Sequence, residues 1–367
     1  MVTMEKEHQF AIALSCIMQW SAKHVVVLKS FFGSLEQAWA GSQEEWHRLG
    51  FSEKRVDKFF LERSEIHPEQ EYELVKKHGV STVLCDDELY PHLLTQIPQA
   101  PALLYYLGTL PAQTMTCLAV VGTRKVSTYG ESATQLLVRP LAQAGYCIVS
   151  GLAYGIDTCA HRIALDVGGC TVAVLANGLD RDSIYPSANI PLAKRIIEHG
   201  GCVMSEYPIG TKPQKAYFPL RNRIVAGMSS GVLVIEAPEK SGALITAFSA
   251  LEQNREVCAV PGPITHRNSA GTNMLLKMGA HVVTCASDIF RALGDDTEDE
   301  ERTQKDPVVL GEIEQKIYDC VSDEAMRVDD ICARIQLDIQ TINSTLGIME
   351  LNGLIKNVGG MRYIRSM

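Results

Sequence analysis

Short apolar runs recur along the middle of the chain, and each run ends in a glycine or a polar turn. Their length suits strands that are buried on both faces of a sheet. They cover residues 118–121, 146–149, 171–175, 202–204, 232–235, 257–260 and 281–284. Helical patterns lie between them. This alternation predicts an α/β fold with an extended Rossmann-like parallel sheet and helices on both of its faces.

The first 65 residues follow helical periodicity instead, with Phe10, Ala13, Leu14 and Ile17 on one stripe. Short helices joined by glycine turns predict a small helical domain of the SAM or helix-hairpin-helix type. A helix-hairpin-helix unit would bind a nucleic-acid backbone, whereas the alternative is a module that contacts protein. Residues 1–114 hold 10 Lys and Arg against 15 Asp and Glu. That acidic balance favours the protein-contact module, because backbone binding depends on positive charge.

The core domain is expected to span residues 66–293, opening with a helix over 68–78, a strand over 80–84 and a proline-rich extension. The acidic stretch 294–307 predicts a solvated linker. Three helical patterns and a glycine-turn hairpin then predict a winged-helix-like domain over residues 308–367. The third helix of that domain contains no Lys or Arg. It therefore favours protein contact or autoregulation over the reading of a DNA duplex.

The charge distribution limits the classes of partner. The net charge of −9 argues against a protein that coats nucleic acid by bulk charge. Residues 115–291 nevertheless hold 16 Lys and Arg against 12 Asp and Glu, which leaves room for a local anionic ligand. No apolar run is long enough to cross a bilayer, and the first residues lack the apolar core of a signal peptide. We therefore expect a cytoplasmic protein that makes no membrane contact.

The chain has 11 cysteines and no C-x-x-C pair. This spacing predicts neither a metal site nor a disulfide framework, and no cofactor is expected. Six of the cysteines lie in or beside apolar runs and are expected to be small buried hydrophobes in a reducing compartment. They are Cys117, Cys147, Cys170, Cys202, Cys258 and Cys285.

The strongest candidate site follows the apolar run at 118–121. A glycine turn and a helical pattern come next, and this arrangement makes an anion pocket where a helix begins. The residues that would form it are Gly122, Thr123, Arg124, Lys125 and Ser127. The stretch matches neither a Walker loop nor a full dinucleotide fingerprint. The alternative is an ordinary tight turn with two solvated bases.

Other polar residues follow the remaining strands. Because ligands of such folds bind beyond the carboxyl ends of the strands, these residues are expected to gather at one rim. They comprise the glycine turn at Gly151, the helix start at Lys240, Ser241 and Gly242, and the cationic and aromatic cluster Lys215, Phe218, Arg221, Asn222 and Arg223. Arginines can pair with phosphates, and an aromatic ring can stack on a base. The alternative is that Arg221 or Arg223 pairs with Glu206 or Glu236 in a structural network.

The motifs AVVGTRKVSTYG, VSGLAYGIDTCAHRIAL, FPLRNRIVAG and VIEAPEKSGALITA closely resemble those of the DprA/Smf family over residues 70–290. The chain departs from the family pattern at Tyr154 and Asn177, both on turns. The resemblance implies a helical N-terminal domain, an extended Rossmann core and a winged-helix tail. It also implies single-stranded DNA binding, loading of the RecA recombinase in natural transformation, and a homodimer. By the same resemblance, Arg124, Lys215, Phe218, Arg221 and Arg223 are DNA-binding residues.

We therefore expect a non-enzymatic protein that binds single-stranded DNA at the rim of the core. The alternative is an enzyme that binds or hydrolyses nucleotides, similar to a phosphoribohydrolase. Its acid–base groups would come from Glu206, Glu236, Asp157 and His161, although their spacing shows no nucleophile and base pair. No catalytic residue is predicted.

Overall fold

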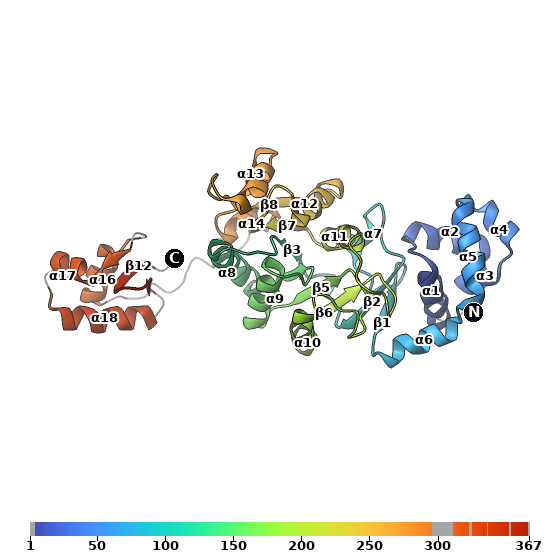
Figure 1. The fold of residues 1–367 in the computed structure, drawn as a ribbon, viewed down its shortest axis with the longest axis horizontal. Coiled ribbons are helices and arrows are strands. Elements are labelled where there is room, and N and C mark those ends of the chain that lie inside the picture. Colours follow the sequence, from blue (N-terminus) through green and yellow to red (C-terminus); the bar gives the residue numbers. More distant parts are fainter. Residues whose placement is uncertain (1–3, 296–310, 323–324, 336, 352–353, 366–367) are drawn as a thin grey trace. The chain divides into compact units, whose positions relative to one another are not determined.

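The computed structural model describes residues 4–295, 311–322, 325–335, 337–351 and 354–365. The chain divides into two compact units, Met1–Asp296 and Thr297–Met367 (Figure 1). The acidic stretch expected to be a linker falls almost wholly outside the described residues.

Five short helices open the first unit, as the periodicity predicts. They are α1 (Met4–Ile17), α2 (Ala22–Phe32), α3 (Leu35–Ala40), α4 (Gln43–Arg48) and α5 (Glu53–Glu62). Their centre is Trp46, which is fully buried and stacks on Phe59 with ring centroids 4.2 Å apart. The same apolar cluster continues into the sheet through Leu103 and Tyr105. The helices therefore share a core with one face of the sheet, and the division at residue 65 stays a prediction.

A sheet of nine strands forms the centre of the first unit (Figure 1). Its order is β1-β2-β6-β5-β4-β3-β7-β8-β9. The strands are β1 (Ser81–Leu84), β2 (Leu103–Gly108), β3 (Cys117–Val121), β4 (Cys147–Ser150), β5 (Thr171–Leu175), β6 (Cys202–Ser205), β7 (Gly231–Val234), β8 (Glu256–Ala259) and β9 (His281–Val282). The pairs from β6 across to β9 are parallel, whereas β2 pairs antiparallel with both β1 and β6. The predicted extended Rossmann-like sheet is thus confirmed.

Helices cover both faces of this sheet. Alternate residues of each strand point to opposite faces, so each strand contacts helices on both sides. Ala119 and Val121 of β3 pack in the cluster that holds α11 and α12, whereas Leu118 and Val120 pack in the cluster that holds α8 and α9. The helices of this unit are α6 (Pro68–Lys77), α7 (His92–Thr95), α8 (Thr128–Gln143), α9 (Ile156–Asp166), α10 (Ile190–Glu198), α11 (Tyr217–Gly227), α12 (Gly242–Glu252), α13 (Ala270–Lys277) and α14 (Ala286–Ala292).

The strand order reverses between β3 and β7. From β3 the chain runs outward through β4 and β5 to β6, and it then returns to place β7 on the other side of β3. Such a switch point leaves a crevice beyond the carboxyl ends of the two strands, where ligands of open α/β sheets bind. The topology therefore places the candidate site at the ends of β3 and β7.

The second unit is a small winged-helix domain, as predicted. It contains α16 (Glu312–Cys320), β10 (Met326–Arg327), α17 (Val328–Ile335), α18 (Ile339–Leu351), β11 (Ile355–Asn357) and β12 (Arg362–Arg365). Strands β11 and β12 form the hairpin, and Gly359 and Gly360 in its turn have positive φ. Ile317, Ile331 and Leu346, one from each helix, are fully buried in its core.

Candidate nucleic-acid interface

A cavity of about 280 Å³ opens at the switch point, between the ends of β3 and β7 and the helices α11 and α12. Ten of the fourteen candidate residues from the sequence line it: Gly122, Thr123, Arg124, Gly151, Phe218, Arg221, Asn222, Lys240, Ser241 and Gly242. Lys125, Ser127, Lys215 and Arg223 do not line it. Most of the residues that were predicted at the rim therefore line one cavity.

Two cations at the mouth of this cavity carry exposed side chains. Arg124 follows β3, and Lys240 precedes α12. Across the described residues, neither Arg124 nor Lys240 makes an ion pair with a carboxylate. The guanidinium of Arg124 lies over the ring of Phe218, 5.4 Å from its centroid. These charges are therefore available to an anionic ligand.

Aromatic rings continue the site beyond Phe218. Tyr185 meets Phe218 edge to face, with centroids 5.9 Å apart. Tyr185 and Tyr154 are 42% and 44% exposed and line a shallow depression that shares Arg124 and Phe218 with the cavity. The two tyrosines were not predicted as site residues. The available signal was an aromatic side chain on a turn beyond a strand end, where it has no core to fill.

The amino terminus of α12 forms one wall of the cavity. Ser241 caps this helix, and its Oγ accepts a hydrogen bond from the Ala243 N–H at 3.3 Å. Ser241, Gly242 and Ala243 all line the cavity. The partial positive charge of a helix amino terminus adds to that of Lys240 at this wall.

The loop between β3 and α8 differs from the expectation of an open anion pocket. The carboxylate of Glu236 accepts the N–H of Ser127 at 3.0 Å and its hydroxyl at 2.5 Å. Ser127 Oγ in turn accepts the N–H of Gly130, and Thr123 Oγ1 accepts that of Lys125. The expectation of free donors at the start of α8 is therefore wrong for Ser127, whose N–H and hydroxyl are bonded to an internal carboxylate.

A second carboxylate occupies the loop between β4 and α9. Asp157 Oδ2 accepts the N–H groups of Gly151 and Ala153 at 3.1 and 3.2 Å. Burial raises the pKa of Asp157, while the positive charge of Arg221 and these backbone hydrogen bonds act in the opposite direction. The amide of Gly151 is thus already used inside the protein.

Arg221 lies in the floor of the cavity and is 5% exposed. Its guanidinium donates to the carbonyl oxygens of Gly151, at 2.8 Å, and Val174. Burial lowers the pKa of Arg221 to about 10, and Asp157 opposes this shift. A side chain at Gly151 would meet this guanidinium, since an added Cβ would lie 2.4 Å from Nη2. Arg221 therefore supports the floor and gives it positive charge.

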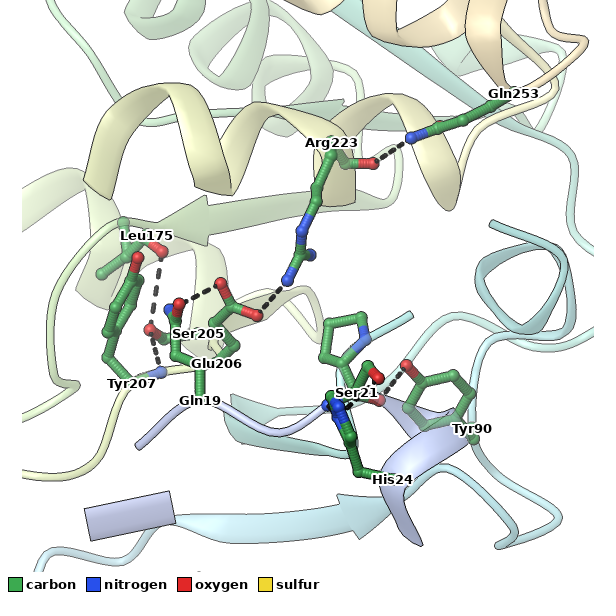
Figure 2. A network of polar contacts seen from close by, with 11 residues as sticks. Gln19, Ser21, His24, Tyr90, Leu175, Ser205, Glu206, Tyr207, Arg223 and Gln253 are labelled. Atoms are coloured by element: carbon green, nitrogen blue, oxygen red, sulfur yellow. Dashed lines mark hydrogen bonds and ion pairs between the residues drawn. The ribbon is translucent and has the colours of Figure 1, made fainter. Parts of the chain in front are cut away.

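Arg223 does not line the cavity, and its side chain points to Glu206 instead (Figure 2). Its Nη2 donates to Oε2 of Glu206 at 2.5 Å, and Gln19, which follows α1, donates to Oε1 at 3.0 Å. Burial raises the pKa of Glu206, and the charge of Arg223 opposes that shift. The structural alternative is thus confirmed for Arg223, which links α11 to the N-terminal helices. Arg221, by contrast, forms no such ion pair with Glu206 or Glu236.

The groups weighed for nucleotide cleavage separate in the structure. Asp157 lines the cavity, whereas Glu206, Glu236 and His161 do not. His161 is fully buried, and its Nδ1 lies 2.7 Å from Thr171 Oγ1. Burial, with a smaller contribution from the charge of Arg221, lowers the pKa of His161 to about 3. His161 is therefore neutral at physiological pH.

Lys125 and Lys215 lie outside the cavity lining but are exposed at its approaches, on the β3–α8 loop and just before α11. Among the described residues, no group of three His, Cys, Asp or Glu side chains is arranged to hold a metal ion. Within the same residues, no helix is long and apolar enough to cross a membrane.

The extended Rossmann core and the winged helix define a two-unit α/β protein with a cationic and aromatic cavity at its switch point. The chain belongs to the DprA/Smf family. Residues 81–294 match the family described as DNA recombination-mediator protein A, and residues 301–361 match the DprA winged helix domain.

Individual relatives agree with this assignment. Protein Smf of Synechocystis is 35% identical over 92% of this chain and 94% of its own length. The crystal structure of DNA processing protein A from Streptococcus pneumoniae is similar with a TM-score of 0.66 and 32% identity, over 79% of this chain and 98% of that chain. DNA processing protein A from Helicobacter pylori, solved to describe its single-stranded DNA binding mode, has a TM-score of 0.52 and 30% identity, over 59% and 96% of the two chains.

Proposed function

We propose that this protein binds single-stranded DNA in the cavity at the β3–β7 switch point. The observation that carries the proposal is the meeting of unpaired cations and an aromatic ring there. Arg124 and Lys240 are exposed without carboxylate partners among the described residues, and the guanidinium of Arg124 lies over the ring of Phe218, which also lines the cavity. Cations that follow the backbone and rings that stack on bases are the two parts of a general single-strand site.

The geometry favours a single strand over a duplex. Phe218 lies inside a cavity, so a base must leave its stack to reach the ring. A single strand provides such bases at little cost, whereas a duplex has to be unpaired first. The solved relative from Helicobacter pylori, reported with a single-stranded DNA binding mode, supports the same ligand.

Lys125 and Lys215 extend the proposed path of the backbone. Both are exposed: Lys125 follows Arg124 on the β3–α8 loop, and Lys215 precedes Phe218 on the loop before α11. Family membership supports the wider role: a cytoplasmic homodimer that protects incoming DNA and loads the RecA recombinase during natural transformation. Light scattering of the purified chain tests the homodimer, and RecA filament formation on coated DNA tests the loading step.

Fluorescence anisotropy with labelled oligo-dT, and with a hairpin duplex as competitor, tests the binding proposal at several salt concentrations. We expect oligo-dT to bind more tightly than the hairpin, with a linear fall of log affinity against log salt. Lys194→Ala is a matched control, because Lys194 is an exposed cation on α10, outside the cavity lining. Equal affinity for both DNAs, or binding that salt does not weaken, would refute the proposal.

Nucleotide cleavage is a second candidate, and Asp157 is the observation that favours it. This carboxylate lines the cavity, and burial raises its pKa, which is the direction that favours a general acid. Both backbone amides bonded to Asp157 argue for a structural role instead. Incubation with nucleoside monophosphates, followed by chromatography for free base, separates the two. We expect no base release; release that Asp157→Asn abolishes would establish the enzyme.

A further inference from the structure

Three cysteines form a row at the amino-terminal edge of the sheet, the edge opposite the DNA cavity. Cys117 begins β3, Cys147 begins β4, and Cys170 directly precedes β5. Cys117 and Cys147 are paired in the parallel register, and the backbone N–H of Ile148 donates to the carbonyl of Cys170 at 3.0 Å. All three cysteines carry free thiols. The sheet therefore holds them on neighbouring strands.

Cys147 and Cys170 are the close pair in this row. Their Sγ atoms lie 3.3 Å apart, within the distance of a sulfur hydrogen bond. Neighbouring strands run about 4.8 Å apart, and a disulfide needs Cα atoms roughly 4.4–6.8 Å apart. The backbone spacing of adjacent strands is thus compatible with a bond between the two sulfurs.

The two thiols have different surroundings. Cys147 is completely buried, while Cys170 is partly exposed, which corrects the expectation that both are buried. The hydrogen bond with Cys147 lowers the pKa of Cys170 more than burial raises it. Hydrogen bonds with Cys117 and Cys170, together with burial, raise the pKa of Cys147. Cys170 is therefore the thiol that an oxidant in solution meets first, and Cys147 is its protonated neighbour.

We propose that Cys147 and Cys170 are a redox modification site that a peroxide converts into an intramolecular disulfide. The Cys170 thiolate attacks the peroxide, an S–O bond forms, the O–O bond breaks, and the leaving hydroxide takes up the proton lost by Cys170. The Cys147 sulfur then attacks the sulfenic acid, the S–S bond forms, and the S–O bond breaks. The second hydroxide takes the Cys147 proton. Two thiols and one hydrogen peroxide thus give one disulfide and two waters.

Mass spectrometry after peroxide treatment of the full chain tests this site. The protein is exposed to hydrogen peroxide, the remaining thiols are alkylated, and the chain is digested without reductant. We expect one dominant cross-linked peptide that joins Cys147 to Cys170, and we expect dithiothreitol to remove it. Cys285→Ser is the matched control, because Cys285 is exposed and outside the row, so this variant should keep the cross-link.

A second variant tests the order of the two steps. Cys147→Ser removes the resolving thiol, so peroxide should leave a sulfenic acid on Cys170 that dimedone labels. The cross-link in the peroxide-treated wild type keeps the test independent of whether this variant folds. A dominant link between Cys117 and Cys147, or sulfinic acid on Cys170 without any cross-link in the wild type, would overturn the proposal.

Discussion

Arg223→Ala is expected to lower folding stability without changing DNA binding, whereas Arg124→Ala is expected to weaken DNA binding with little change in stability. The sequence had predicted one DNA-binding role for both arginines. Arg223 is paired with Glu206 at 2.5 Å, and their side chains are 16% and 4% exposed. Without this arginine, the buried carboxylate keeps only Gln19 as a side-chain partner in the described structure. Removing one member of a buried ion pair costs about 3–5 kcal/mol of folding free energy. Arg124, exposed and without an ion pair, should cost less than about 0.5 kcal/mol.

DNA binding should separate the variants in the other direction. Each phosphate contact with a single strand contributes about 0.7 to the slope of log affinity against log salt. Arg124→Ala should therefore lower the slope by about 0.7, which is roughly a 2.6-fold smaller loss of affinity between 50 and 200 mM salt. Arg223→Ala should leave the slope unchanged under conditions where the variant is folded.

Urea unfolding and anisotropy titrations of both variants provide the measurements. Glu206→Gln serves as the control background: once the buried charge is gone, the further change Arg223→Ala should cost clearly less than it does in the wild type. The assignment of Arg223 as a structural link fails if Arg223→Ala unfolds at the wild-type urea concentration and lowers the salt slope as Arg124→Ala does.

Three further predictions follow from the cavity and its floor. Because the pKa of His161 is lowered from 6.5 to about 3, the folded state binds fewer protons than the unfolded chain, and stability falls as the pH decreases. Between pH 7 and 5 the loss of folding free energy attributable to His161 is about 2 kcal/mol. Urea unfolding of His161→Gln should therefore show a loss that is smaller by about 2 kcal/mol over the same pH range. Gly151→Ala should destabilise by about 1–3 kcal/mol in the same assay through its clash with Arg221, whereas Gly242→Ala, with nothing within 4 Å, should not; equal costs would contradict this reasoning. Phe218→Ala should weaken oligo-dT binding by about 1–3 kcal/mol in anisotropy while Phe218→Tyr retains it, and an unchanged affinity in the alanine variant would exclude stacking.

The sheet was largely predictable because its strands are buried on both faces. Such strands appear as continuous apolar runs, and the seven predicted from residue 118 onward end within two residues of the observed bounds. The antiparallel extension was less accessible. The residues around 105 were expected only as part of a proline-rich extension, and the strand that they form pairs about a hundred residues away, where Tyr105 is opposite Ser205. Nothing local in a sequence specifies such a pairing.

Helix geometry divides the candidate residues of α11 between the cavity and another part of the protein. Phe218, Arg221 and Asn222 are spaced i, i+3 and i+4 on α11, so they share a face, and all three line the cavity. Arg223 lies two positions beyond Arg221, and residues with that spacing do not face the same side. The triplet Arg221-Asn222-Arg223 therefore had to divide between two surroundings. The spacing does not show that Glu206 is the partner of Arg223, because that contact depends on the tertiary structure.

The two internal carboxylates explain why the cavity must rely on side-chain charge. Glu236 accepts the N–H of Ser127 at the start of α8, and Asp157 accepts two amides in the turn that leads to α9. These backbone donors are satisfied within the protein, so a DNA phosphate would have to displace a carboxylate to reach them. In the proposed site, the attraction of the DNA backbone therefore depends on Arg124, Lys240 and the amino terminus of α12. Because exposed cations act through counterion release, binding at such a site depends steeply on salt and only weakly on sequence.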